Sequence, residues 1–215
     1  MEKKKSGFLD KLDNFWYYHK GKVFLALLVA VVIIACIGYV NSVTDKTEYD
    51  FCVTSVFARP MTTGDYTINE QLEDVISDID KNGSVAINAK SYYITEAATG
   101  DNDSISIAKF EADISRAAGD LLLFDRANLE RFLPKDLFAD ISEYVDISQF
   151  PEENIVYRED VPVAVRLKDS KVLTDMKFII DDIYACVMFT PDNADDATLA
   201  SRNTCKAAIE KLIQK

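Results

Sequence analysis

The sequence predicts an α/β fold: a three-layer domain with a mixed, mostly parallel five-stranded sheet, preceded by one transmembrane helix. Residues 23–40 are a run of eighteen residues without a charge. Beyond residue 48, short apolar runs typical of buried strands alternate with segments of helical periodicity. Residues 1–40 carry six lysines against three acidic residues, so the rest of the chain carries a net charge of −15. We therefore expect the two parts to lie in different surroundings.

Histidine content and charge exclude several functions for the part of the chain beyond the apolar run. The single histidine, His19, lies before that run. Catalytic Ser-His-Asp and Cys-His pairs and histidine-ligated zinc are therefore excluded after it, and we expect no enzyme. A strongly negative domain repels phosphate backbones, so nucleic acid is not an expected partner. No cofactor is expected, apart from the calcium ion considered below.

Residues 1–22 are predicted to be a basic cytoplasmic leader. Lysines crowd this flank, and the positive-inside rule places such a flank in the cytoplasm. The aromatic residues at positions 15–18 resemble the belt found at a membrane interface. Residues 23–40 would span about 27 Å as a helix, close to the roughly 30 Å core of a bilayer. We expect a single-pass protein of the cell membrane with an extracytoplasmic C-terminal domain.

Cys36 offers a second interpretation of the apolar run. Residues 33–36 (IIAC) match a bacterial lipobox, in which the chain is cut before Cys36 and the cysteine is lipidated. Against this, the run stays apolar as far as Val40, as an uncleaved helix requires. Both interpretations place the domain outside the cytoplasmic membrane, after a polar tether at residues 41–48.

Five segments of the domain, residues 49–215, have the composition of strands. The first, third and fifth are apolar on both faces, as in a sheet covered by helices on both sides. The second and fourth alternate apolar and polar residues, and Pro162 places the fourth at an edge or at the strand's own first residue. In chain order, the predicted strands are residues 49–57, 85–94, 120–124, 161–167 and 183–189.

The predicted helices have recognisable start and stop signals. Thr67 and Glu70 form a capping box, and Asp125 caps a short helix that Pro134 ends. In chain order, the predicted helices are residues 67–79, 105–118, 125–133, 137–144 and 195–213. The last helix is expected to bury Leu199, Cys205, Ile209 and Leu212. Residues 151–159 are expected to be an irregular crossing segment, and residues 170–177 a short connection.

Residues 118–146 (AGDLLLFDRANLERFLPKDLFADISEYVD) carry a resemblance to a known class. A helix leads into a strand that ends at an acidic residue, and a second helix follows. A phrase of the form Gly-Leu-Phe-x-Asp-Leu-Ser-x-Tyr is then filled by Leu137, Phe138, Asp140, Ile141, Ser142 and Tyr144. This arrangement resembles extracellular solute-binding proteins of the type 2 periplasmic-binding class.

The resemblance implies a truncated relative with a single lobe and an N-terminal membrane anchor. Members of that class usually have two lobes, and the insertion that forms the second lobe is missing between residues 157 and 173. The implied strand order is 2-1-3-n-4. Closure of two lobes around a ligand is not expected for such a chain.

Asp78, Asp80 and Asn82, followed by Gly83, match the first half of a calcium loop of the form D-x-D-x-N-G. Oxygen ligands at alternating positions can surround a hard cation there. The twelfth position is Ala89, where a bidentate glutamate is expected. The competing interpretation is an Asx-rich turn that joins a helix to a strand.

A second candidate site follows from the predicted strand order. Ligands of open α/β sheets lie beyond the carboxyl ends of the strands, where the order reverses. In the implied order, that crevice would be lined by Arg59, Tyr66, Asp125 and Arg126. The arginines would clamp an anionic group that Asp125 orients. The competing interpretation is that Asp125 only caps its helix and that the arginines are solvated.

We expect a membrane-anchored, extracytoplasmic module that binds a small-molecule or protein ligand and resembles one lobe of a solute-binding protein. The alternative is a structural or accessory subunit of a membrane protein assembly without a small-molecule ligand. An open pocket at the strand-order reversal would favour the binding module. A filled reversal point with an exposed apolar patch elsewhere would favour the accessory subunit.

Overall fold

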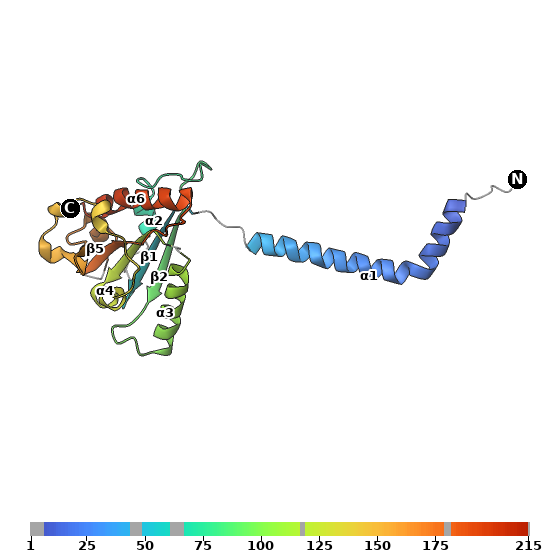
Figure 1. Cartoon of the computed structure of the whole chain (residues 1–215), viewed down its shortest axis with the longest axis horizontal. Coiled ribbons are helices and arrows are strands. Elements are labelled where there is room, and N and C mark those ends of the chain that lie inside the picture. Colours follow the sequence, from blue (N-terminus) through green and yellow to red (C-terminus); the bar gives the residue numbers. More distant parts are fainter. Residues whose placement is uncertain (1–6, 44–48, 61–66, 117–118, 179–181, 215) are drawn as a thin grey trace. The chain divides into compact units, whose positions relative to one another are not determined.

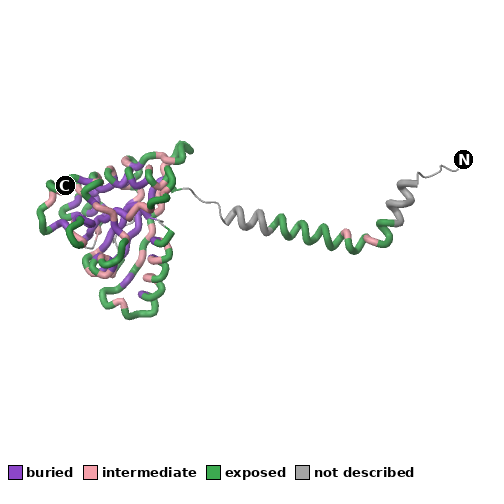
Figure 2. Tube along the Cα trace, viewed as in Figure 1, coloured by how far each residue is buried: buried purple, intermediate pink, exposed green. Residues whose placement is uncertain are grey.

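The chain divides into two units, Met1–Thr47 and Glu48–Lys215, which are described separately. Figure 1 labels the elements of both, and Figure 2 shows that the second unit has a buried interior. The computed structural model describes residues 7–43, 49–60, 67–116, 119–178 and 182–214, with side chains in the first of these ranges only at 15–35.

The first unit contains one long helix, α1 (Gly7–Val43), which runs from the predicted leader through the apolar run. Its stretch Phe15–Ala35 has 21 residues and a mean hydropathy of 1.8, so it is long and apolar enough to cross a membrane. None of that stretch is buried, whereas the core helix of a soluble domain is mostly buried. Cys36 lies in α1, but its side chain is outside the described residues, and its lipidation stays a prediction.

The second unit is built on an open sheet of six strands among the described residues, in the order β2-β1-β3-β6-β5-β4. Three of the strands consist mostly of apolar residues that are buried on both faces, as the sequence predicts for the first, third and last of its five strands. The strands are β1 (Phe51–Phe57), β2 (Ile87–Tyr93), β3 (Leu121–Asp125), β4 (Ile155–Arg158), β5 (Val161–Arg166) and β6 (Ile183–Val187).

The prediction of five strands, mostly parallel, is wrong in detail. β1 pairs in parallel with β2 and β3, but β6 pairs antiparallel with β3 and β5, and β4 pairs antiparallel with β5. The order 2-1-3 agrees with the expectation, and the last strand then inserts beside β3. The additional strand, β4, lies in a segment expected to be irregular. It has four residues and a bulge after Val156, so its sequence pattern is too short to identify.

Pro162 lies in β5, an internal strand of the described sheet, and the prediction of an edge strand or a first position is wrong. β5 pairs with β6 only at Val165 and Arg166, beyond Pro162 in the chain. On its other side, Pro162 faces Tyr157 next to the bulge in β4. The missing amide of the proline therefore falls where pairing is absent or irregular.

Helices cover both faces of the sheet and give three layers. α2, α5 and α6 contribute buried residues to the cluster on one face, and α3 and α4 contribute to the cluster on the other. Alternate residues of β3 and β6 enter the two clusters, which is the two-residue period of a strand. The helices are α2 (Ile68–Leu72), α3 (Asp101–Ile114), α4 (Arg126–Phe132), α5 (Lys171–Asp175) and α6 (Asp196–Leu212). Single turns of 3₁₀ helix are η1 (Ile141–Glu143), η2 (Ile147–Gln149) and η3 (Glu152–Asn154).

α2 is shorter than predicted, and the Thr67 hydroxyl makes no capping hydrogen bond. Beyond this helix, the buried Asp50 carboxylate accepts hydrogen bonds from the backbone N–H groups of Ile79 at 2.6 Å and Asp80 at 3.2 Å. The N–H of Ile79, the last residue of the predicted helix, therefore bonds to a distant side chain instead of to a helical carbonyl. A pattern of apolar residues at helical spacing therefore overestimated the length of this helix.

Other helical predictions also differ from the structure: the helical part of residues 137–144 is only the 3₁₀ turn η1, and the helix predicted at 105–118 is α3 (Asp101–Ile114). Leu199 of α6 is 44% exposed, not buried, because it lies about 200° around the helix from Ser201, which faces the sheet. α5 occupies part of the segment 170–177, which is predicted to be only a short connection, and the Ser170 hydroxyl caps it by accepting from Leu173 N–H. A helix of five residues leaves too little periodicity to predict. The other buried positions predicted for α6 are confirmed.

Candidate functional site

The predicted ligand crevice lies at the carboxyl ends of β1 and β3, and Asp125 fills it. Asp125 Oδ2 accepts a hydrogen bond at 2.5 Å from the backbone N–H of Ala58, just after β1. Its Oδ1 accepts from the backbone N–H of Asn128 at 2.9 Å and so caps α4, as the sequence predicts. The carboxylate therefore joins β1, β3 and α4.

The other residues predicted for this crevice do not converge. Arg126 binds Glu130 through Nε at 2.5 Å and the hydroxyl of Tyr184 through Nη1 at 3.2 Å. Arg59 is exposed after β1, and Tyr66 lies outside the described residues. Cavities of about 560, 370 and 470 Å³ elsewhere in the described part of the domain are lined by none of these side chains. The arginine clamp stays a prediction without a cavity to support it.

Replacing Asp125 with alanine (Asp125→Ala) is expected to lower the free energy of unfolding by roughly 2 kcal/mol. The substitution removes the cap of α4 and leaves the Ala58 N–H without its acceptor. Urea unfolding of the Glu48–Lys215 unit measures the change. The control is Asp146→Ala, because Asp146 caps only the exposed turn η2. Equal, small losses in both variants would contradict the role of Asp125 at the strand ends.

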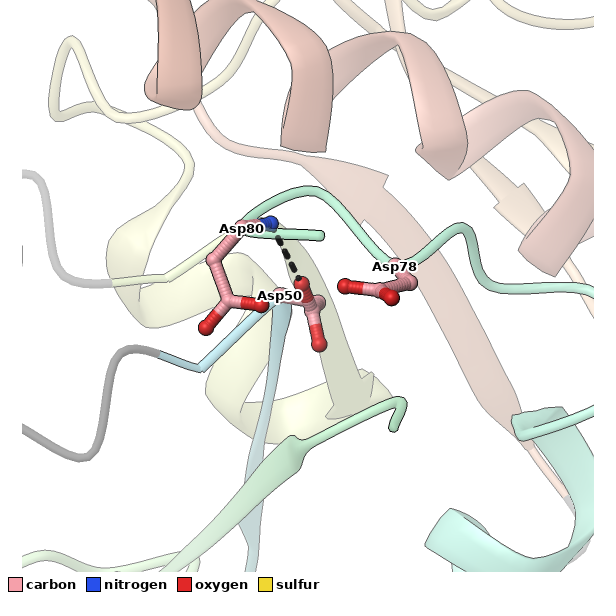
Figure 3. A group of neighbouring side chains, drawn as sticks. All are labelled: Asp50, Asp78 and Asp80. Atoms are coloured by element: carbon pink, nitrogen blue, oxygen red, sulfur yellow. Dashed lines mark hydrogen bonds between the residues drawn. The ribbon is translucent and has the colours of Figure 1, made fainter. Parts of the chain in front are cut away.

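The residues of the predicted calcium loop gather near a residue that the sequence did not indicate, Asp50 (Figure 3). Carboxylate oxygens of Asp50, Asp78 and Asp80 lie within 4.8 Å of one another. Asp50 is buried just before β1, whereas Asp80 is exposed. A signal for Asp50 existed, since it is an acidic residue directly before a strand without any charged residue.

These carboxylates already accept hydrogen bonds from the backbone. Asp50 Oδ2 accepts from Ala86 N–H at 2.8 Å, and Asp78 Oδ2 accepts from Gly83 N–H at 2.8 Å. The latter bond is the main reason why the pKa of Asp78 is lowered from its ordinary value. Asn82 Oδ1 accepts from the N–H of Ser84 at 2.9 Å. The loop thus has the bonding of an Asx-rich turn, and calcium binding stays a prediction.

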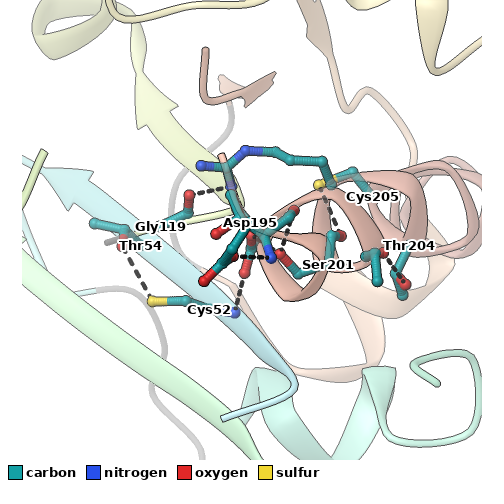
Figure 4. A network of polar contacts seen from close by, with 11 residues as sticks. Cys52, Thr54, Gly119, Asp195, Ser201, Thr204 and Cys205 are labelled. Carbon is teal, nitrogen blue, oxygen red and sulfur yellow. Dashed lines mark hydrogen bonds and ion pairs between the residues drawn. The ribbon is translucent and has the colours of Figure 1, made fainter. Parts of the chain in front are cut away.

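A buried polar network that the sequence analysis missed lies at the amino ends of β1 and β3 (Figure 4). The Asp120 carboxylate, just before β3, accepts from the backbone N–H of Cys52 at 2.7 Å. It also accepts from Ser201 Oγ and from Arg202 Nη1, each at 2.6 Å. The same nitrogen of Arg202 donates to the carbonyl oxygen of Gly119. Since Ser201 and Arg202 belong to α6, the network joins this helix to the sheet.

Water has little access to this network. Arg202 is 2% exposed, and its Nε and Nη2 have no hydrogen-bond partner among the described residues. Burial raises the pKa of Asp120, while Arg202, Ser201 Oγ and Cys52 N–H act in the opposite direction. The sequence signal was a pair of polar residues, Ser201 and Arg202, on the buried face of the last helix. The ion pair of Asp120 and Arg202 therefore holds α6 against the sheet.

The cysteines of the domain are also structural. Cys52, Cys186 and Cys205 are free and buried. Burial raises the pKa of each thiol above its ordinary value. Because the thiolate is the nucleophilic form, these cysteines are poor nucleophiles at neutral pH.

The 560 Å³ cavity lies at the carboxyl end of β5, between the segment η2–η3 and the end of α6. β3 and β5 are both antiparallel to β6, so their carboxyl ends lie at the same edge of the sheet. The cavity is therefore at the edge where α/β sheets bind ligands, but on the other side of β6 from the predicted crevice. Two of its lining residues, Asn154 and Arg166, contain a buried polar atom without a partner among the described residues.

No family model, no curated protein and no solved structure matches this chain.

Proposed function

We propose that this chain is a single-pass membrane protein whose extracytoplasmic α/β domain binds a small ligand, in the manner of one lobe of a solute-binding protein. The observation that carries the proposal is the 560 Å³ cavity at the carboxyl edge of the sheet. Ligand pockets typically enclose about 300–1,000 Å³ and combine an apolar lining with a few polar groups. The α1 helix supports the membrane attachment, and the lysine-rich flank supports a cytoplasmic N-terminus.

An accessory subunit of a membrane assembly is the second candidate function. The observation that favours it is that Asp125 fills the point where the strand order reverses. Its carboxylate accepts hydrogen bonds there from the backbone N–H groups of Ala58 and Asn128. The exposed large apolar side chains of the described domain are Tyr49, Tyr93, Ile105, Val161 and Leu199. They belong to separate segments of the chain, so the cavity is the stronger indication.

A thermal-shift screen of the full-length chain in detergent micelles tests the binding function. The screen uses amino acids, peptides, sugars, nucleosides and organic anions. A compound at about 100 times its dissociation constant stabilises the folded state by about 2.7 kcal/mol, or roughly 5–10 °C in Tm for a domain of this size. The variant Ile213→Trp, at the cavity wall, is expected to lose the shift. Lys206→Trp, at an exposed position of α6 outside the lining, is expected to keep it.

Two outcomes of this screen would contradict the binding function. One is a shift of equal size in the native chain and in Ile213→Trp, which places the ligand elsewhere. The other is that no compound class shifts the melting temperature of the native chain, although both tryptophan variants still unfold cooperatively. That outcome leaves the accessory subunit as the better proposal.

A further inference from the structure

The cavity beside β5 is lined by apolar side chains and by charged side chains of both signs. Phe150, Leu167 and Ile213 supply apolar surface. The basic residues are Arg166 and Lys168, and the acidic residues are Glu153, Asp169 and Glu210. A ligand with one sign of charge would pair with only one of these two sets of residues. The lining therefore favours a molecule that carries both charges on an apolar body.

Arg166 is the group suited to an anion. It is the last residue of β5 and binds the Asp182 carboxylate through Nη2. A guanidinium has five N–H donors, and this ion pair uses only part of them. Its Nε is buried and has no partner among the described residues. A carboxylate is the usual bidentate partner of such a group.

Asn154 supplies a hydrogen-bond acceptor that lacks a donor. It is 6% exposed at the end of η3, and its Oδ1 has no hydrogen-bond partner in the described part of the chain. A buried acceptor without a partner costs about 1–3 kcal/mol, so native structures contain few of them. Asn154 lines the cavity, and a ligand N–H is the kind of partner that would satisfy this oxygen.

The acidic side of the cavity suits an ammonium group. Glu210 and Ile213 lie at the end of α6, a helix of 17 residues, and the C-terminus of a helix favours a positive charge. Glu153 and Asp169 add exposed carboxylates from two other segments. Lys168 is the opposing charge on this rim, which leaves the acidic residues in excess.

The geometry points to a small zwitterion, an apolar α-amino acid or a short apolar peptide, as the ligand of this cavity, an inference that rests on the proposed binding function. Its carboxylate binds Arg166, and its ammonium group lies near Glu210 with an N–H directed to Asn154 Oδ1. Its apolar side chains cover Phe150 and Leu167. Recognition needs both charges, because each lies opposite a group of the other sign.

Isothermal titration of the full-length chain in detergent micelles with leucine, leucyl-leucine and trileucine tests this assignment. At least one of the three is expected to bind. For that compound, acetylation of the amine or amidation of the carboxylate removes one charge and keeps the apolar body. Each change is expected to weaken binding at least tenfold. Equal binding of the charged and blocked forms, or no binding of any of the three, overturns the assignment.

Variants of the chain locate the two charges. Arg166→Met is expected to weaken binding of the free compound at least tenfold and to have little effect on binding of its amide, because the amide lacks the carboxylate. Glu210→Gln is expected to weaken binding of the free compound at least tenfold and to have little effect on binding of the acetylated form, because that form lacks the ammonium group. Glu130→Gln, at an exposed position outside the cavity, is the control and should leave binding unchanged. A loss of equal size for the free and blocked forms in Arg166→Met would overturn the pairing.

The outcome also separates this inference from the broader proposal. If the zwitterions fail but another compound class gives a shift that Ile213→Trp abolishes, the cavity binds a ligand and the assigned chemistry is wrong. If no compound binds at all, both proposals fail.

Discussion

Replacing Asp120 with asparagine is expected to lower the free energy of unfolding by about 3–5 kcal/mol. The change hardly alters the volume, but it leaves the Arg202 charge, 2% exposed, without its carboxylate. An arginine cannot lose its proton under these conditions, so the uncompensated charge stays buried. The Cys52 N–H and Ser201 Oγ also lose an ionised acceptor. Urea unfolding of the Glu48–Lys215 unit, followed by far-UV circular dichroism, measures the loss.

Arg202→Met is expected to cost less than Asp120→Asn and to respond to pH. Burial already raises the pKa of Asp120, and removal of the arginine raises it further. The folded state then binds a proton that the unfolded state has released, so stability falls as the pH rises above the unfolded pKa. Relative to the native chain, the variant should regain stability when the pH is lowered from about 7 to about 5.

The exposed pair Lys211–Asp74 is the matched control for this network. Its side chains are 24% and 63% exposed, and Asp74→Asn is expected to cost no more than about 1 kcal/mol. The double variant with Asp120→Asn and Arg202→Met removes both charges and should recover part of the stability lost in Asp120→Asn. If Asp120→Asn costs no more than the surface control, the buried ion pair is not what holds α6 on the sheet.

Placing two arginines in α1, Leu28→Arg together with Val32→Arg, is expected to release the chain from membranes. Both positions lie within the stretch Phe15–Ala35 and near the middle of the apolar run. An arginine near the centre of a spanning helix costs about 2.5–3.5 kcal/mol, so two cost roughly 5–7 kcal/mol. Carbonate extraction of cell membranes measures the result. The matched control, Leu28→Ile together with Val32→Leu, should stay in the pellet, and retention of the arginine variant there would contradict a spanning helix.

Labelling of single introduced cysteines in intact and lysed cells tests the orientation of this helix. The described cysteines of the domain are buried, so a cysteine placed at exposed Glu96 is the expected site of labelling there. In Glu96→Cys, a membrane-impermeant maleimide should react in intact cells. A cysteine in the leader, Ser6→Cys, should react only after lysis. The reverse pattern would place the domain in the cytoplasm and contradict the extracytoplasmic function.

The central elements of the fold were predictable because their patterns are long or wholly apolar. β1 and β3 are buried along their length, and their sequences have no polar alternation that would suggest a solvated face. The Asp125 cap of α4 was predictable because it depends only on residues three positions apart. β4 and α5 were missed because four or five residues carry little pattern, and long-range pairing or packing stabilises them instead.

The candidate sites were less predictable than the fold. The loop that begins at Asp78 was identified, but Asp50 joins it from 28 positions earlier in the chain. The partner of Asp120 is Arg202, 82 positions away, and no local rule links them. Asn154 and Arg166 meet at one cavity only because β5 ends beside the turn η3 and α6.

The sequence by itself determined the apolar helix, the uneven charge, the lack of a histidine beyond residue 19 and the α/β class. These properties depend on composition and on periods of two and 3.6 residues, which any short stretch of chain displays. Only the tertiary structure decided that β6 is antiparallel to both β3 and β5, that Asp125 fills the point where the strand order reverses and that a cavity opens beyond β5. Those outcomes depend on which distant segments pack together, and the free energy of that packing belongs to pairs of segments rather than to either segment alone.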